Sequence, residues 1–333
     1  MNAWLGLDSN DRRLACEKAA VELGISAVSV EKDFWVCWVL RELLSLPGWG
    51  EQLTLKGGTS LSKAWKLIDR FSEDIDLVID REHIGFGGPT LSGSRVDKLK
   101  KACSAKISGE LRPALLERIR KALPEGAGWT LSLAGRDEDR DQLTLLFAYP
   151  SVLSIEAGYI KREVRMEFGA RSETEPAERP TIQPFLAEQV PGMFSSAAFV
   201  VKTIAARRTF WEKAMLLHEE YYRPMEKPLK KRLSRHYYDL GCLIRKGIAA
   251  EAVKDAALFD RIAKHREAFF RQKWLDYKTL KKGSLRIVPP EERLAEWRRD
   301  YQAMRGEMFF SEPPQFAKIL ETVGEFEADF NRA

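Results

Sequence analysis

The sequence predicts an α/β fold, in which a mixed sheet with flanking helices is followed by a helical C-terminal domain. Short segments with an apolar residue at every second position, typical of strands, lie within residues 1–195. From residue 196 onward, apolar residues recur every three to four positions, as in amphipathic helices. An extended, proline-rich connection at 172–195 separates the two patterns. We therefore predict two domains, residues 1–195 and residues 196–333.

The first domain is expected to begin with helices at 10–23 and 28–44. Ser29 is the expected N-cap of the second helix, and the nearly all-apolar stretch Phe34–Leu40 predicts its burial against the sheet. Strands are predicted at 53–56, 74–79, 129–133, 143–147 and 160–168, helices at 59–68 and 96–122, and a glycine-rich loop at 83–95. In the second domain, helices are predicted at 199–222, 229–246, 250–280, 291–305 and 314–330.

The most informative motif joins the first two predicted strands. Successive strand residues face opposite ways, so Asp74 and Asp76 share one face of the second strand. They stand roughly 7 Å apart, which suits two Mg2+ ions about 3.5–4 Å apart, as used in nucleotidyl transfer. The Gly57-Gly58 turn after the first strand would offer backbone N–H groups to a phosphate.

Each part of this motif has a simpler explanation. An isolated Asp-x-Asp is more often a solvated strand face, and an isolated Gly-Gly is more often an ordinary turn. Here the two occur together between apolar strands, where aspartate is disfavoured. The combination favours a nucleotide and metal site.

The same residues resemble a known family. Gly57-Gly58-Thr59-Ser60, thirteen residues and then Asp74-Ile75-Asp76 resemble the signature of DNA polymerase β-type nucleotidyltransferases. The longer segment Lys56–Asp80 is similar to the AbiEii/AbiGii toxin branch of that superfamily, relatives of the MenT toxins. The stretches Glu31–Val36 and Glu167–Ser172 match the same branch, and the resemblance covers about residues 28–240. It implies a polymerase β-type nucleotidyltransferase core in the first domain.

The resemblance also implies further site residues. A polymerase β-type site usually has a third carboxylate on a neighbouring strand, for which Glu167 is our choice and Glu163 the alternative. Lys213 and Asp239 fall where the AbiEii branch has a helical lysine and a further aspartate. Without the resemblance, Glu167 would be part of an exposed strand face, and Lys213 and Asp239 ordinary helix-surface charges.

We assign these candidates the following roles. The expected metal ligands, for two Mg2+ ions, are Asp74, Asp76 and Glu167. The expected phosphate cradle for an NTP substrate is Gly57, Gly58, Thr59 and Ser60. Lys213 would neutralise the triphosphate, and Asp239 would orient Lys213 or Arg235. The candidate catalytic residues are Asp74, Asp76, Glu167, Lys213 and Asp239.

The function implied by the resemblance is that of a Mg2+-dependent toxin of a type IV toxin–antitoxin or phage-defence system. Such an enzyme transfers a nucleoside monophosphate from an NTP to RNA, namely the 3′ end of tRNA, and blocks translation. A cognate antitoxin would be its protein partner. Two alternatives stay open: transfer to a protein or small molecule, and a non-catalytic nucleic-acid-binding module with the same fold.

The charge distribution permits an RNA partner without requiring one. The net charge is +5, but residues 202–235 carry ten Lys or Arg against four Glu. Phe210, Trp211, Tyr221 and Tyr222 are interleaved with them. Basic residues with aromatics suit a nucleic-acid surface, whereas the simpler explanation is the solvated face of a helix.

Composition also bounds the location of the protein. The four cysteines are scattered without a CxxC motif, which favours isolated thiols over a zinc site or a disulfide framework. No apolar run reaches the roughly 18–20 residues of a membrane span, and the N-terminal residues do not resemble a signal peptide. We therefore expect a cytoplasmic protein without a membrane partner.

Overall fold

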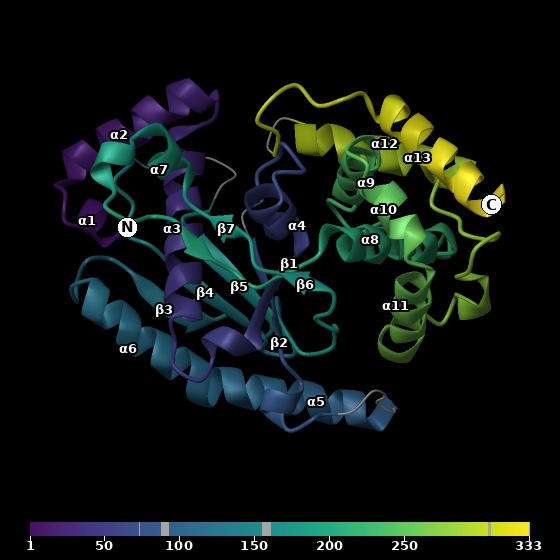
Figure 1. Ribbon diagram of the computed structural model, residues 1–333, viewed down its shortest axis with the longest axis horizontal. Helices are drawn as coiled ribbons and strands as arrows, with labels where there is room; N and C mark the ends of the chain where they lie inside the picture. The colour runs from purple at the N-terminus through teal and green to yellow at the C-terminus, as the bar shows by residue number, and fades with distance from the viewer. Residues whose placement is uncertain (73, 88–92, 155–160, 306–307, 333) are drawn as a thin grey trace. The chain divides into compact units, whose positions relative to one another are not determined.

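The computed structural model (Figure 1) describes residues 1–72, 74–87, 93–154, 161–305 and 308–332. It divides into two compact units, which are described separately below. The first contains Met1–Trp65 and Phe71–Ile204, and the second contains Lys66–Arg70 and Ala205–Ala333. The units thus divide after Ile204, and the chain enters the second unit briefly between the glycine turn and the second strand.

A mixed sheet forms the centre of the first unit. In the described residues its strand order is β3-β4-β5-β2-β1-β9-β6. The strands are β1 (Leu53–Lys56), β2 (Asp74–Ile79), β3 (Thr130–Leu133), β4 (Thr144–Ala148), β5 (Glu163–Gly169), β6 (Ala177–Glu178) and β9 (Thr203–Ile204). β2 is antiparallel to β1 and parallel to β5, so β2 lies between the strands that carry the glycine turn and Glu167. A separate pair, β7 (Thr181–Ile182) and β8 (Phe199–Val200), is antiparallel.

Helix α3 (Ala27–Leu44) packs against this sheet and crosses it in Figure 1. The Trp35 and Trp38 rings lie 5.9 Å and 5.8 Å from the ring of Phe147 on β4. The predicted burial of its apolar stretch is confirmed, because Phe34–Leu40 is almost entirely inaccessible to solvent. The remaining helical segments are α1 (Asn2–Leu5), α2 (Ser9–Leu23), α4 (Gly57–Thr59) with a π turn (Ser60–Ala64), α5 (Gly93–Lys106), a π turn (Ile107–Leu111), α6 (Arg112–Ala122) and α7 (Phe185–Gln189).

The predicted cap of α3 is wrong by one turn. Ser26 is the N-cap, and its Oγ accepts a hydrogen bond from the backbone N–H of Ser29 at 3.1 Å. Ser29 lies inside the first turn, where its own hydroxyl is 2.8 Å from the Ser26 hydroxyl. Because both residues are serines, composition alone did not distinguish the cap from the residue it caps.

The second unit is helical. Its helices are α8 (Ala206–Tyr221), α9 (Arg235–Arg245), α10 (Ile248–Lys254), α11 (Ala256–Phe269), α12 (Leu294–Arg305) and α13 (Phe316–Arg332). Aromatic side chains form its core: the Trp211 ring lies 4.8 Å from Phe259 and 5.1 Å from Phe330. The predicted combination of a mixed sheet, flanking helices and a helical C-terminal region is confirmed.

Several predicted helix boundaries are wrong. Residues 199–204 form β8 and β9, and helix α8 begins only at Ala206. The reason is tertiary: β8 pairs with β7, and the Leu55 N–H of β1 donates to the Lys202 carbonyl at 2.8 Å, so that β9 joins the central sheet beside β1. The predicted helix at 59–68 ends at Ala64, and the one at 229–246 begins at Arg235.

Four further predictions need correction or restriction. The connection at 172–195 contains β6, β7 and α7, and the helices predicted at 250–280 end at Phe269. Residue 160 of the predicted strand and residues 88–92 of the predicted loop lie outside the described residues.

The four cysteines are free and buried, as expected. None of the helices in the described part of the chain has the length and hydropathy needed to span a bilayer.

Candidate active site

The glycine turn lies directly against one of the predicted metal ligands. Gly57 has φ +74°, a left-handed conformation that favours glycine. A Cβ atom at this position would lie 2.0 Å from Oδ2 of Asp76. Only glycine therefore allows the backbone to come this close to the Asp76 carboxylate. The proposed phosphate turn and the proposed metal ligand are separated in the sequence but are neighbours in space.

The hydroxyl groups of the next two residues support this turn. The Thr59 hydroxyl lies 2.5 Å from the Asp74 carbonyl oxygen and 3.0 Å from the Ser72 hydroxyl. The Ser60 hydroxyl donates to the Gly57 carbonyl at 2.8 Å. Both side chains are fully buried. What Thr59 and Ser60 have available for a phosphate is therefore backbone N–H rather than hydroxyl, while Thr59 ties the turn to β2.

The strand register places the three predicted carboxylates on one face of the sheet. Along β2, Asp74 and Asp76 are partly exposed whereas Ile75 and Leu77 are buried, so the expected alternation holds. Asp76 pairs with Glu167 of the parallel strand β5. Paired residues of neighbouring strands project to the same side. Glu167 is therefore the carboxylate that this register puts beside Asp76.

The alternative carboxylate, Glu163, lies beyond this pairing. The first residue of β2, Asp74, pairs with Arg165, and Glu163 precedes that pair with a partner only on β4, namely Ala148. Its carboxylate is 3.8 Å from the ammonium of Lys161, which is largely exposed. The register thus favours Glu167 over Glu163.

Arg165 lies on the same strand face as Glu167, as its position in the sequence predicts, but it was not among the predicted site residues. Its Nε donates to Glu167 at 2.8 Å, and an Nη lies 3.3 Å from Glu138. Burial by itself would lower the pKa of the guanidinium, but the hydrogen bond to Glu167 and the charges of Glu167 and Asp74 outweigh it and raise the pKa. The alternation of charge at residues 163, 165 and 167 was the available signal.

These residues fit a magnesium ion in their chemistry. Carboxylate oxygens are the ligands that Mg2+ prefers, and the close approach of Gly57 leaves the Asp76 carboxylate beside unobstructed backbone. Among the described residues, however, no group of three His, Cys, Asp or Glu side chains is arranged to hold a metal. Glu167 is paired with Arg165 instead. Asp74 and Asp76 thus stay the predicted ligand pair, and Glu167 would have to exchange its partner to join them.

A buried ion pair between Lys63 and Asp33 links the segment after the glycine turn to helix α3. Lys63, in the π turn after Ser60, lies 2.8 Å from Asp33 of α3, and both side chains are almost wholly buried. Asp33 also accepts the backbone N–H of Phe185 at 2.7 Å, and the Lys63 ammonium lies 3.6 Å from the centre of the Phe185 ring. Asp33 belongs to a stretch that matched the family, but its role emerged only from the fold.

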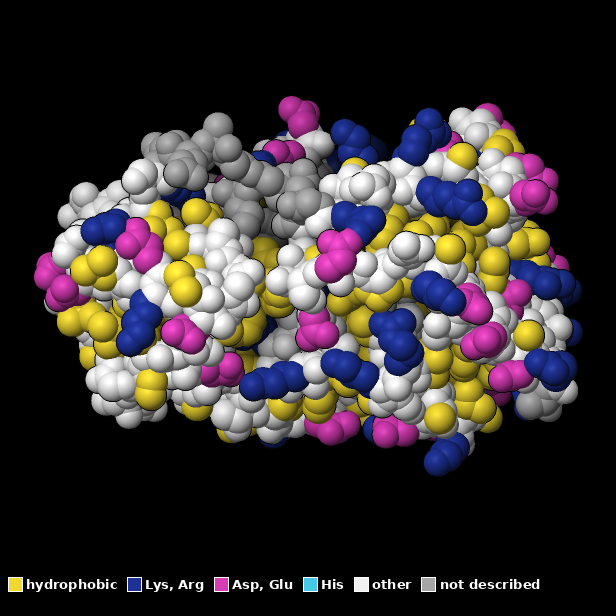
Figure 2. Space-filling model, turned by 90° about the horizontal axis from the view of Figure 1, so that it is seen from above, with side chains coloured by type: hydrophobic (Ala, Val, Ile, Leu, Met, Phe, Trp, Pro, Cys, Tyr) yellow, Lys and Arg dark blue, Asp and Glu magenta, His cyan; other side chains and the backbone are white. Residues whose placement is uncertain are grey.

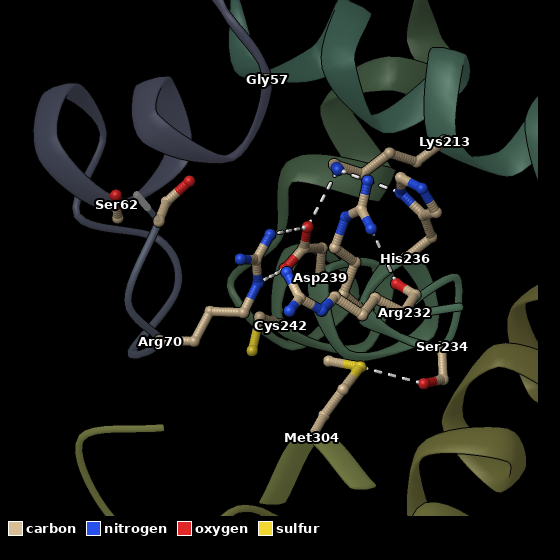
Figure 3. A network of polar contacts seen from close by, with 12 residues as sticks. Gly57, Ser62, Arg70, Lys213, Arg232, Ser234, His236, Asp239, Cys242 and Met304 are labelled. Carbon is tan, nitrogen blue, oxygen red and sulfur yellow. Dashed lines mark hydrogen bonds and ion pairs between the residues drawn. The ribbon is translucent and has the colours of Figure 1, made fainter. Parts of the chain in front are cut away.

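Lys213 and Asp239 lie side by side in the second unit, where the Asp239 carboxylate is the centre of a cluster of cationic side chains (Figure 3). Asp239 is fully buried and pairs with the Lys213 ammonium at 2.9 Å. Arg70, which belongs to this unit, binds the same carboxylate through two hydrogen bonds of 2.7 Å and 2.8 Å. Lys213 Nζ also lies 3.3 Å from Nδ1 of His236. Of the two partners proposed for Asp239, the ion pair is with Lys213, whereas the contacts with Arg70 and His236 were not anticipated.

Burial and neighbouring charges favour the charged forms of Asp239 and Arg70 but disfavour the charged form of Lys213. Burial raises the pKa of Asp239, but Arg70 and Lys213 together hold it well below its ordinary value. For Arg70, the charge of Asp239 outweighs burial, so its pKa is raised. For Lys213, burial dominates, and Arg70 adds to it, so its pKa is lowered despite Asp239. Arg70 and Asp239 thus stabilise each other, while Lys213 is kept beside a second cation at a cost.

Two of the four aromatic residues predicted for the surface of the 202–235 stretch do not lie on it, whereas Tyr221 and Tyr222 are half-buried. Phe210 and Trp211 are fully buried in the core, and the Trp211 indole N–H donates to the Ala252 carbonyl at 3.1 Å. Arg208 and Lys213 of α8 are buried as well, so the basic residues of this helix do not line a single solvated face. On the face seen in Figure 2, Lys and Arg side chains of the described residues are interspersed with acidic and apolar ones.

Known protein families and solved structures were compared with the sequence and the structure of this chain. A model of the family described as "Nucleotidyl transferase AbiEii toxin, Type IV TA system" matches residues 38–322. JHP933 from Helicobacter pylori has a similar structure, with 14% identity, a TM-score of 0.38 and coverage of 91% of this chain and 90% of its own. MenT4, a nucleotidyltransferase toxin from Mycobacterium tuberculosis H37Rv, has 17% identity, a TM-score of 0.36 and coverage of 90% and 100%.

No curated protein matches the sequence. The family model, in contrast, spans most of the chain and includes the glycine turn, β2, Lys213 and Asp239. The chain belongs to the AbiEii family of nucleotidyltransferase toxins of type IV toxin–antitoxin systems.

Proposed function

We propose that this nucleotidyltransferase transfers a nucleoside monophosphate from an NTP to a hydroxyl group of tRNA, at its 3′ end, and so blocks translation. The observation that supports the proposal is the close approach of Gly57 to Asp76, since a phosphate bound by the turn would then lie beside a metal ion bound by this carboxylate. The acceptor hydroxyl oxygen attacks the α-phosphorus, the bond to the β-phosphate oxygen breaks, and pyrophosphate leaves.

The residues of the first unit divide this work. The backbone N–H groups of the turn from Gly57 to Ser60 bind the phosphates, and the buried Thr59 hydroxyl keeps that turn against β2. Asp74 and Asp76 would hold Mg2+. When bound, Mg2+ would supply positive charge to the phosphate oxygens and favour deprotonation of the attacking hydroxyl. Glu167, beside Asp76, would join the ligands or accept the hydroxyl proton.

We assign to Lys213 the neutralisation of the triphosphate charge. Its ammonium is oriented by Asp239 at 2.9 Å. Its lowered pKa supports this role, because a cation that the fold disfavours is more readily explained by a ligand than by stability. A compact ammonium on a long side chain suits the triphosphate as a point charge.

The biological setting follows from the family. A type IV toxin–antitoxin system implies a cognate antitoxin that counteracts the toxin. We propose that inhibition of translation by tRNA modification is how the toxin arrests growth, and that phage infection is a condition under which this arrest protects the population.

The test is incubation of the purified protein with each of the four α-labelled NTPs, Mg2+, and either tRNA, total RNA without tRNA, or lysate protein. We expect label on tRNA with a preference for one NTP, and no label when EDTA replaces Mg2+. Periodate oxidation of the tRNA 3′ terminus before the reaction should prevent labelling. Label on protein alone would replace the proposal by protein modification, and no label on any acceptor would contradict transfer to a macromolecule.

A further inference from the structure

Two loops of the second unit carry an unusual excess of exposed basic side chains. One is residues 223–232, between α8 and α9, and the other is residues 271–286, between α11 and α12 (yellow-green in Figure 1). Their exposed cations are Lys227, Lys230, Lys231, Arg271, Lys273, Lys278, Lys281, Lys282 and Arg286. Their acidic residues are Glu226 and Asp276, whereas the whole chain has 54 basic and 49 acidic residues. The excess is therefore local.

Trp274 joins the two loops into one surface. The Lys227 ammonium lies 4.2 Å and the Arg223 guanidinium 5.2 Å from the centre of its ring. The Trp274 indole N–H donates to the Glu219 carbonyl of α8 at 3.2 Å. Both loops thus lie at the C-terminal end of α8. We call them together the 223–232/271–286 surface.

The second loop is held in place mainly by groups other than its basic side chains, of which Arg286 lies 3.8 Å from Glu327 of α13. Leu275, Leu280 and Leu285 are buried and anchor it to the core. Asn331 of α13 brackets Leu285, accepting its backbone N–H at 3.0 Å and donating to its carbonyl at 2.8 Å. The Thr279 hydroxyl lies 3.1 Å from His218 of α8. The cations between these anchors are presented to solvent on a fixed backbone.

Most of these cations lack a neutralising partner. In the part of the chain that the structure describes, no carboxylate lies within 4.0 Å of Lys230, Lys231, Arg271, Lys273, Lys278, Lys281 or Lys282. Several like charges on one surface repel each other, and the negative charges of a bound polyanion relieve this repulsion. The release of the counterions condensed on the polyanion favours binding further. Lysine, a point charge without a planar fork, suits phosphate oxygens better than base edges.

We propose that the 223–232/271–286 surface binds the phosphate backbone of the RNA acceptor. This inference rests on the proposed function, in which the acceptor is tRNA. An acidic protein is the competing partner, but a protein interface has an apolar centre. Among the described large hydrophobic side chains of these loops, only Met225 is exposed. The surface therefore fits a uniformly charged backbone rather than a protein.

The test compares two double variants that each remove two charges from exposed lysines of the second unit. K281Q/K282Q changes the proposed surface, and K254Q/K264Q, on α10 and α11, is the matched control. Binding of fluorescent bulk tRNA is measured at salt concentrations between 50 and 200 mM. NTP and Mg2+ are left out, so that no nucleotide transfer takes place during the measurement. Each phosphate contact contributes about 0.7–0.9 to the slope of log Kd against log salt.

We expect K281Q/K282Q to reduce that slope by about 1–2 and to weaken tRNA binding roughly tenfold at low salt. K254Q/K264Q should bind as wild type does. NTP binding, followed separately, should be the same in all three proteins. K230Q/K231Q, on the other loop, should behave like K281Q/K282Q if the two loops form one surface.

The outcomes separate this inference from the proposed function. Identical tRNA binding by K281Q/K282Q and K254Q/K264Q overturns the surface, even where wild type modifies tRNA. Salt-sensitive tRNA binding that K281Q/K282Q weakens supports the surface, even where no nucleotide is transferred. Poly-glutamate bound as tightly as tRNA, with the same loss in K281Q/K282Q, overturns RNA as the partner in favour of an acidic protein.

Discussion

Arg70 and Asp239 form a buried, two-point ion pair within the second unit, although they are 169 positions apart in the sequence. The Nε and Nη2 atoms of Arg70 lie 2.7 Å and 2.8 Å from the two carboxylate oxygens of Asp239. Arg70 stands in the connection between the glycine turn and Asp74. This pair therefore anchors the connection that leads into β2.

Replacement of Arg70 by methionine should be strongly destabilising. It leaves Asp239, a fully buried carboxylate, with Lys213 as its remaining cationic partner, and breaking a buried pair costs about 3–5 kcal/mol. Urea unfolding of Arg70→Met should show this loss. The exposed pair of Lys318 and Glu321 is the control, because Lys318→Met should leave stability nearly unchanged. Equal stabilities of the two variants would show that Arg70 does not anchor the segment.

The same pair predicts a dependence of stability on acid pH. The pKa of Asp239 in the folded protein lies below its ordinary value of 3.8. A carboxylate with a depressed pKa stabilises the fold above its unfolded pKa and loses that contribution as the pH falls toward the folded pKa. The stability difference between wild type and Asp239→Asn should thus be constant above about pH 5 and shrink below about pH 4. A difference that grew in acid would contradict this assignment.

Lys213→Met should separate catalysis from folding. Arg70 continues to neutralise Asp239 in this variant, and the lowered pKa of Lys213 indicates that the fold does not favour its charge. Stability should change by less than about 1 kcal/mol. Turnover should fall roughly 10²-fold, because a cation is lost from the phosphates. Steady-state kinetics, with Lys254→Met as control, decide the matter, and wild-type turnover in Lys213→Met would end the catalytic role.

Asp76→Asn should abolish nucleotide transfer and leave the protein folded. The amide keeps the shape that packs against Gly57 but removes the charge that a divalent cation requires. Melting should show a change within about 1 kcal/mol. Asp80→Asn, just after the same strand, is the matched control, because its Oδ1 can still accept the Glu82 N–H, as Asp80 does at 2.9 Å. Equal activity of the two variants would remove Asp76 from the site.

Glu167→Gln and Glu163→Gln should differ sharply. Glu167 pairs with Asp76 in the parallel strand register, whereas Glu163 lies beyond the first residue of β2. Turnover should fall roughly 10²-fold in Glu167→Gln and stay near wild type in Glu163→Gln. Measurement over a range of Mg2+ concentrations shows whether the loss arises in metal binding. The reverse order of effects would assign the third carboxylate to Glu163.

Local patterns were sufficient where the structure depends on local geometry. The strands at 53–56 and 74–79 and the helix at 10–23 were recognised within a residue, because period and propensity are properties of neighbouring residues. For the same reason, the shared face of Asp74 and Asp76 followed from the sequence alone. The position of Glu167 beside Asp76, in contrast, was predicted only from the family resemblance, and it depends on the register between β2 and β5.

Tertiary structure decided the features that depend on which partner a residue meets. Residues 199–204 have a helical pattern but include two short strands, since β7 and β1 offer backbone groups with which β8 and β9 pair. Phe210 and Trp211 could have stacked on bases, but the helical core buries them. The sequence by itself thus determined the chemistry of the candidate site, through residue types and local spacing. Only the tertiary structure decided which charges are buried together, because burial and pairing depend on residues far apart in the chain, such as Arg70 and Asp239.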